Sequence, residues 1–192
     1  MGKRIETAER GFFLIRINSF DNDTKNELEK ALKKTSAVTP LVIDLRGNRG
    51  GNLIAAVDSA GIFLAKGVKV IGVRTRSGFR YYRTFGRGKY AAYRLYIWQN
   101  ERTASSAEVF IAALTDNGRA VSIGERTYGK GSRQDVIQLS DGSALVLTTG
   151  YLGTPEGFLY NGKGLDPVFP LKEKTLSSDE YWIKTEKLFH NQ

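Results

Sequence analysis

The segment "YRLYIWQNERTASSAEVFIAALTDNGRAVSIG", residues 93–124, contains the pattern that decides the fold. Residues 93–100 form an apolar stretch typical of a buried strand, and residues 119–124 are a second short apolar stretch. Between them, residues 105–118 carry apolar side chains at helical spacing. A strand, a helix and a strand in this order indicate an α/β domain whose sheet is partly parallel.

The same order of elements occurs upstream of this segment. Residues 11–20 predict a strand and residues 21–34 a helix. A nearly continuous apolar run at 39–45 predicts a buried strand, and a glycine-rich turn at 46–52 leads into a helix at 53–67. The chain therefore predicts repeated strand–helix units within one domain.

Three further elements are predicted outside these units. Residues 68–76 read as a strand, and residues 133–152 as a hairpin that turns at Asp141-Gly142. Residues 177–189 predict a helix near the end of the chain. We therefore expect a mixed sheet flanked by helices.

Composition excludes several kinds of active site. The chain has 192 residues, of which 41% are hydrophobic, and this suits one globular domain. It has no cysteine, which excludes thiol nucleophiles, disulfides and thiolate zinc sites. The one histidine is His190, so the usual Ser-His-Asp triad requires the chain terminus to fold back into the site. Proton transfer near neutral pH must otherwise use lysine, tyrosine or a carboxylate. No signal peptide and no apolar run long enough to span a bilayer is visible.

The positive charge of the chain is concentrated in one segment. The net charge is +9, and residues 74–94 hold six arginines and one lysine without an acid. Arginine interleaved with tyrosine and phenylalanine could stack bases and pair with phosphates. The alternative is a solvated strand pair, with arginines outward and aromatic side chains inward.

The turn "RGNRGGN", residues 46–52, follows a predicted strand and precedes a predicted helix. Backbone N–H groups at Gly50 and Gly51 could converge there on an anion, because glycine tolerates positive φ and lacks a Cβ atom. This suggests a phosphate cradle or an oxyanion hole, although neither nucleotide-binding fingerprint is met. The alternative is a plain structural turn.

Ser105 stands at the start of the helix within the opening segment. Together with Glu108, three residues later, it forms a capping-box pattern, which is a purely structural reading. A serine at a helix N-terminus after a buried strand is also placed where the helix dipole favours a developing oxyanion. Both readings are open at this point.

Lys130 lies between Gly129 and Gly131 in "GERTYGKGSRQ", residues 124–134. Glycine on both sides suggests a backbone that enters a packed site, and burial would lower the pKa of the lysine. Service as a base at neutral pH requires a drop of roughly 3 pKa units from the ordinary lysine value. A structural or exposed lysine is the alternative, but a serine, a lysine and anion-cradling glycines together are what a Ser-Lys acyl-transfer site needs.

The segments "DLRGNRGG", "TASSAEVFIAALTDNGRAVSIGERTYGKGSRQ" and "GYLGTPEG…GKGLDP" resemble the carboxyl-terminal processing (tail-specific) serine protease family. The resemblance implies the family's α/β core, similar to the crotonase and Clp protease superfamily. It also implies a division into a lead-in at 1–10, a catalytic core at 11–171 and a helical tail at 172–192. The PDZ domain that family members usually carry before the core is absent from this chain.

The resemblance implies a role for seven residues. The first serine after the Thr-Ala pair, Ser105, would be the nucleophile, and Lys130, 25 positions later, the base. Gln134 would orient the lysine amine. The amides of Ser106 and Gly51 would donate to the oxyanion, with Gly50 as their neighbour. Asp116 would be an acid that supports the site.

The implied function is a serine endopeptidase with a Ser-Lys dyad that cleaves polypeptides near unstructured C-termini. No metal or cofactor, no nucleic-acid partner and no membrane span is expected, and the family's habit implies an extracytoplasmic location. The alternative is a catalytically silent ligand- or peptide-binding module of the same fold. Two departures from the family pattern are Arg49, where proline is frequent, and Pro167-Val168, where a Pro-Asp pair is usual.

Overall fold

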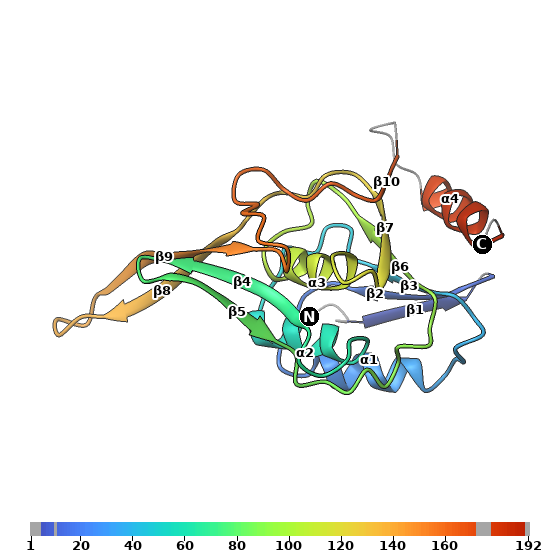
Figure 1. Ribbon diagram of the computed structural model, residues 1–192, viewed down its shortest axis with the longest axis horizontal. Coiled ribbons are helices and arrows are strands. Elements are labelled where there is room, and N and C mark those ends of the chain that lie inside the picture. The colour runs from blue at the N-terminus through green and yellow to red at the C-terminus, as the bar shows by residue number, and fades with distance from the viewer. Residues whose placement is uncertain (1–4, 10, 172–177, 191–192) are drawn as a thin grey trace.

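The main sheet of the molecule has six strands in the order β1-β2-β3-β6-β7-β10 (Figure 1). The computed structural model describes residues 5–9, 11–171 and 178–190. All neighbouring strands in this sheet are parallel except β1 and β2, which are antiparallel. The strands are β1 (Ile5–Glu9), β2 (Phe13–Ile17), β3 (Leu41–Asp44), β6 (Leu95–Gln99), β7 (Ala120–Gly124) and β10 (Phe169–Pro170). The predicted α/β class with a mixed sheet is confirmed.

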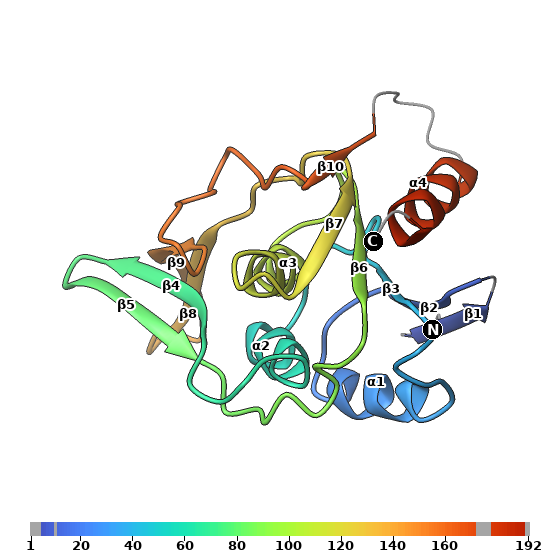
Figure 2. The same cartoon turned by 45° about the vertical axis from the view of Figure 1, so that its right-hand side comes forward.

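Helices cover both faces of this sheet (Figure 2). Three of them, α1 (Thr24–Leu32), α2 (Leu53–Gly61) and α3 (Ser106–Thr115), pack on one face over the larger hydrophobic core. The helix α4 (Ser178–His190) covers the other face, over a smaller apolar cluster. The predicted C-terminal helix therefore exists and is docked.

The central strands are apolar because they are covered from both sides. Every residue of β3 and of β6 is buried. Trp98 on β6 faces α4, and its indole N–H donates a hydrogen bond of 2.9 Å to the Thr185 hydroxyl. A strand in this position has no solvated face, so its sequence shows no polar alternation.

A second, antiparallel sheet has the order β5-β4-β9-β8 and extends away from the body (Figure 1). Its strands are β4 (Lys69–Thr75), β5 (Gly78–Arg83), β8 (Ser132–Gln138) and β9 (Ala144–Gly153). The predicted hairpin is formed by β8 and β9. In β5, Phe79 and Tyr81 are partly covered while Arg80 and Arg83 are exposed. This part of the basic segment therefore forms a solvated strand, which was the alternative to a nucleic-acid-binding segment.

The structure differs from the expected elements in three places. The short strands β1 and β10 were not predicted, and β1 lies in the stretch that the resemblance treats as a lead-in. The helix α2 ends at Gly61 instead of residue 67, because Phe63 turns into the core and its amide bonds the Ala60 carbonyl. The division of the chain at residues 10 and 171 stays a prediction. In the part of the chain that the structure describes, no helix has the length and apolarity needed to cross a bilayer.

Candidate active site

Three loops meet at the carboxyl ends of the parallel strands β3, β6 and β7. The Ala104 amide donates to the Asn48 carbonyl at 2.9 Å, which joins the loop after β6 to the glycine-rich turn after β3. The Tyr128 amide donates to the Thr103 carbonyl at 2.9 Å, which joins the loop after β7 to the loop after β6. This edge of a parallel sheet is where ligands bind in α/β proteins. The three stretches singled out in the sequence are therefore neighbours.

Ser105 has an unusual backbone conformation. Its φ is 59° and its ψ is −125°, and among the described residues it is the only one other than glycine with positive φ. Such a conformation costs of order 1–3 kcal/mol and persists only where the surroundings enforce it. Ser105 is half-buried and precedes the first residue of α3. One half of the capping box is formed, since the Ser105 amide donates to Glu108 Oε2, whereas the Ser105 hydroxyl makes no cap hydrogen bond. Ser105 therefore begins the helix while its hydroxyl stays available for chemistry.

The Glu108 carboxylate is the hub that enforces this arrangement. Glu108 is fully buried, and its Oε2 atom accepts from the backbone N–H groups of Ser105 and Lys130, each at 2.8 Å. Its Oε1 atom accepts from the Gly129 amide at 2.7 Å and from the Thr127 hydroxyl. One carboxylate therefore holds the backbone of the serine loop and that of the lysine loop together.

Burial raises the pKa of Glu108, and the four donors around it oppose this shift. The sequence predicts Glu108 only as the partner of Ser105 in a capping box. Glu108 is the one acid in the apolar sequence of α3. This position could have indicated its role, because a buried carboxylate must be hydrogen-bonded.

Two backbone donors beside Ser105 are unused. Neither the Gly51 amide nor the Ser106 amide donates a hydrogen bond to any residue within the described ranges. The Gly50 amide is engaged, since it donates to Asn48 Oδ1 at 2.8 Å. Ser106 is buried, whereas Gly51 is exposed. A buried backbone N–H group is rarely left without an acceptor, so the Ser106 amide is suited to an external oxygen, and Gly51 offers a second amide at the exposed side.

Gly50 has a steric role in this site. A Cβ atom added to it would lie 2.8 Å from the Cβ of Ser105 and 2.9 Å from the Ser106 nitrogen, and its φ is 96°. The turn can approach the serine only because this position is glycine. The structure thus places Gly50 in contact with Ser105 but not as a free donor.

Ser106 is buried, and its hydroxyl has no hydrogen-bond partner in the described part of the chain. Ser106→Ala is expected to raise the free energy of unfolding by about 1 kcal/mol, because it removes an unsatisfied buried polar group. Peptide cleavage should persist, since the backbone amide is retained. Urea unfolding measures the change. The control is Ser122→Ala, which removes the acceptor of the Val168 amide at 3.0 Å and should lower stability. If both variants lowered the free energy of unfolding equally, the prediction would be wrong.

Lys130 is packed through its backbone but not through its side chain. A Cβ atom on Gly129 would lie 2.6 Å from the Gly164 nitrogen, and one on Gly131 would lie 2.9 Å from the Asn161 nitrogen. The flanking glycines therefore admit the backbone to a packed site, as expected. The expected burial of the amine is not found, because the Lys130 side chain is exposed.

The structure does not join the three side chains of the expected catalytic set. No hydrogen bond links the Ser105 hydroxyl, the Lys130 amine and the Gln134 amide among the described residues. Gln134 is exposed on β8, next to a bulge between Arg133 and Gln134. The backbones are thus held in place while the Lys130 and Gln134 side chains are exposed. Catalytic hydrogen bonds are often open in this way without substrate.

Asp116 lies away from these groups. It is the C-cap residue of α3, whereas Ser105 is the N-cap residue, so about 16 Å of helix separates them. Asp116 Oδ2 accepts from the Glu156 amide at 3.3 Å. This acid therefore contacts the turn after β9 rather than the serine.

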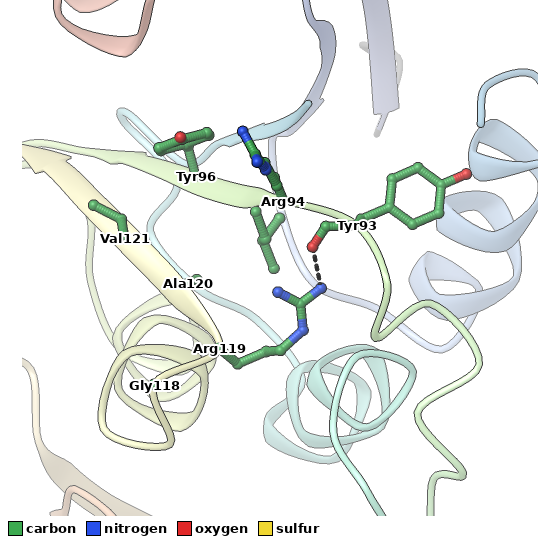
Figure 3. Close-up of a pocket in the computed structure, with 8 residues that line it drawn as sticks. Tyr93, Arg94, Tyr96, Gly118, Arg119, Ala120 and Val121 are labelled. Atoms are coloured by element: carbon green, nitrogen blue, oxygen red, sulfur yellow. Dashed lines mark hydrogen bonds between the residues drawn. The ribbon is translucent and has the colours of Figure 1, made fainter. Parts of the chain in front are cut away.

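A separate hollow lies at the opposite ends of β6 and β7 (Figure 3). One of its lining cations is the half-buried Arg119, whose guanidinium donates to the backbone carbonyls of Tyr90 at 3.2 Å and Tyr93 at 2.6 Å. Burial lowers the pKa of Arg119. The Arg119 guanidinium already binds backbone carbonyls of the segment before β6, so this hollow is not the favoured candidate for the active site.

Comparison with known proteins shows to which family the chain is similar. Residues 12–170 match the model of peptidase family S41. The chain is 36% identical over 172 residues to carboxyl-terminal-processing peptidase 1, chloroplastic, of Arabidopsis thaliana, covering 86% of this chain and 35% of that protein. It is 36% identical over 170 residues to a probable CtpA-like serine protease of Staphylococcus aureus, covering 86% of this chain and 34% of that protein.

One solved structure is similar to this chain over most of its length. The photosystem II D1 C-terminal processing protease superposes with a TM-score of 0.79 at 32% identity, covering 88% of this chain and 45% of that one. The chain thus spans about a third of the length of these two curated relatives.

Proposed function

The chain belongs to peptidase family S41, and we propose that it is the catalytic core of a serine endopeptidase that cleaves polypeptides near unstructured C-termini through a Ser105–Lys130 dyad. The family resemblance seen in the sequence is confirmed by these matches. The observation that supports the proposal most directly is the pair of unused amides, Gly51 and Ser106, beside a strained Ser105.

In the proposed reaction the Ser105 hydroxyl oxygen attacks the carbonyl carbon of the scissile peptide. Neutral Lys130 takes the hydroxyl proton, and the carbonyl oxygen becomes an oxyanion. Collapse of the tetrahedral intermediate breaks the C–N bond, and the Lys130 ammonium returns the proton to the leaving amine. Water then hydrolyses the acyl-enzyme by the same steps.

The oxyanion would be held by the Gly51 and Ser106 amides at the N-terminal end of α3. Each such donor typically contributes roughly 3–4 kcal/mol to stabilising the transition state. The donors are backbone groups on a hydrogen-bonded turn and a helix end, so they need little reorganisation during the reaction.

The exposed Lys130 requires one further step. A peptide lying over the loop after β7 would cover the amine, and desolvation favours the neutral form of a lysine. Gln134, four residues along the chain, would then orient the amine. Asp116 would support the site indirectly, by holding the turn that contains Glu156.

A catalytically inactive ligand- or peptide-binding module is the second candidate function. It is favoured because no hydrogen bond joins the Ser105 hydroxyl to the Lys130 amine among the described residues. The test uses an unstructured polypeptide substrate and a fluorophosphonate probe. Wild-type protein should cleave the substrate and take up the probe, and Ser105→Ala should do neither. Lys130→Met should lower kcat by a factor on the order of 10²–10⁴, as expected for loss of a general base.

The control for the lysine is Lys66→Met, which removes an exposed lysine after α2. If Lys130→Met behaved like Lys66→Met, the base assignment would be wrong. If wild-type protein bound the peptide without cleaving it, the binding module would be the better description.

The substrates we propose are proteins and peptides with flexible tails. An extracytoplasmic or lumenal location is part of the same proposal, and it agrees with the name of the Arabidopsis relative, which is called chloroplastic. Oligomeric state does not enter the proposed mechanism.

A further inference from the structure

A pocket of about 260 Å³ adjoins the serine loop. It is large enough for one amino-acid side chain. Its wall includes Ala104, the residue before Ser105, so whatever occupies it lies next to the nucleophile. The residues that line it are Arg49, Glu101, Arg102, Ala104, Tyr128 and Lys130.

The pocket carries an excess of positive charge. Three of its lining residues are cations and one is an acid. The acid, Glu101, forms an exposed ion pair with Arg102, with Nε and Oε1 3.4 Å apart. Neither Arg49 nor Lys130 makes a side-chain ion pair or hydrogen bond within the described ranges. If Lys130 is neutral during the reaction, Arg49 and Arg102 still outnumber Glu101.

Hydrogen bonds hold the backbone around the pocket, so the positions from which the charged side chains extend are defined. The Arg102 amide donates to Asn100 Oδ1 at 3.2 Å, and the same oxygen accepts from Gly47 at 2.9 Å. The Tyr128 amide is bound to the Thr103 carbonyl. Tyr128 is 67% exposed, and its ring offers an apolar surface beside the cations.

These features match the side chain of an acidic residue. Guanidinium groups bind carboxylates with paired N–H donors, and an exposed ring can pack on the methylene groups that precede the carboxylate. An apolar side chain would leave Arg49 without a partner in a pocket covered by the peptide. We propose that this pocket binds a glutamate or aspartate side chain of the substrate close to the scissile bond, with Arg49 as the main specificity-determining residue.

This inference rests on the proposed peptidase function, and the experiment separates the two. A neutral parent peptide is scanned with glutamate and, in parallel, with glutamine at each position near the cleavage point. Each peptide is made with a free and with an amidated C-terminus. Cleavage by wild-type protein gives kcat/KM, and fluorescence anisotropy with the Ser105→Ala variant gives binding without turnover.

We expect one position at which glutamate is preferred over glutamine about threefold to tenfold, from contacts with two partly solvated arginines. Arg49→Gln should reduce this preference about threefold to fivefold, Arg102→Gln should reduce it less, and 0.5 M NaCl should weaken it in wild type. The matched control is Arg87→Gln, an exposed arginine in the segment after β5, which should leave the preference unchanged.

The proposal is overturned if no position prefers glutamate, or if Arg87→Gln acts like Arg49→Gln. A preference that follows the free C-terminus rather than the glutamate would assign the pocket to the terminal carboxylate and would also overturn it. If wild type cleaves nothing while the Ser105→Ala variant binds acidic peptides through Arg49, the peptidase function fails and the pocket assignment stands.

Discussion

Replacing Glu108 by glutamine is expected to lower kcat for peptide cleavage on the order of a hundredfold, because the serine and lysine loops lose their common anchor. A glutamine has one acceptor oxygen, whereas the carboxylate oxygens accept from the Ser105, Lys130 and Gly129 amides and from the Thr127 hydroxyl. The glutamine NH₂ group would replace one of the two carboxylate oxygens. It would then face either the Ser105 and Lys130 amides or the Gly129 amide and the Thr127 hydroxyl, all of which are donors. KM should change little, since Glu108 is fully buried. Steady-state kinetics measures both constants.

Stability should fall with activity in this variant. Donors left buried without acceptors cost about 1–3 kcal/mol each, so Glu108→Gln is expected to lower the free energy of unfolding by about 2–4 kcal/mol. Glu29→Gln on α1 is the matched control, with the same change of charge far from the site. Normal kcat in Glu108→Gln would contradict the role of Glu108 as a positioning residue.

The pH dependence of stability gives an independent readout for Glu108. Burial raises its pKa, so the folded protein holds this proton more tightly than the unfolded chain does. The stability that this tighter proton binding contributes is therefore greatest below the ordinary carboxyl pKa, and it is lost as pH rises through the raised value. The difference in unfolding free energy between wild type and Glu108→Gln should therefore decrease as pH rises through the raised pKa of Glu108. Parallel pH profiles of the two proteins would show that the fold does not raise this pKa.

Replacing Gly50 by alanine is expected to abolish detectable cleavage and to lower the free energy of unfolding by about 2–4 kcal/mol. The added methyl group would press on the Ser105 Cβ atom and the Ser106 nitrogen, each closer than 3 Å, at a φ of 96°. The turn must then move away from the serine and take the Gly51 amide with it. Urea unfolding and a peptide cleavage assay measure the two effects.

Gly47→Ala separates backbone strain from this contact. Gly47 lies in the same turn with a φ of 75°, but nothing lies within 4 Å of a Cβ atom added there. It should cost only about 1 kcal/mol and keep most of the activity. If the two variants lost equal activity, the close approach of Gly50 to Ser105 would not be what matters.

Much of the fold could be predicted because its signals are local. Continuous apolar runs predicted β3 and β6, and helical spacing predicted α1 and α3. The strand β10 is two residues long and is defined only by its pairing with β7, so no periodic pattern announces it. The end of α2 depends on packing, which propensity alone does not report.

The candidate site divides in the same way. The sequence by itself determined the residue types and their order: a serine at a helix start, a lysine between glycines, a glycine-rich turn, and no histidine or cysteine near them. The tertiary structure alone decided which atoms are free. The Gly50 amide is hydrogen-bonded, whereas those of Gly51 and Ser106 have no acceptor among the described residues. Glu108 is the shared acceptor, Lys130 is exposed, and Asp116 lies at the far end of α3. The reason is that hydrogen bonding and burial depend on contacts between loops 20 to 60 residues apart in the chain, and no local pattern encodes which donor is left without a partner.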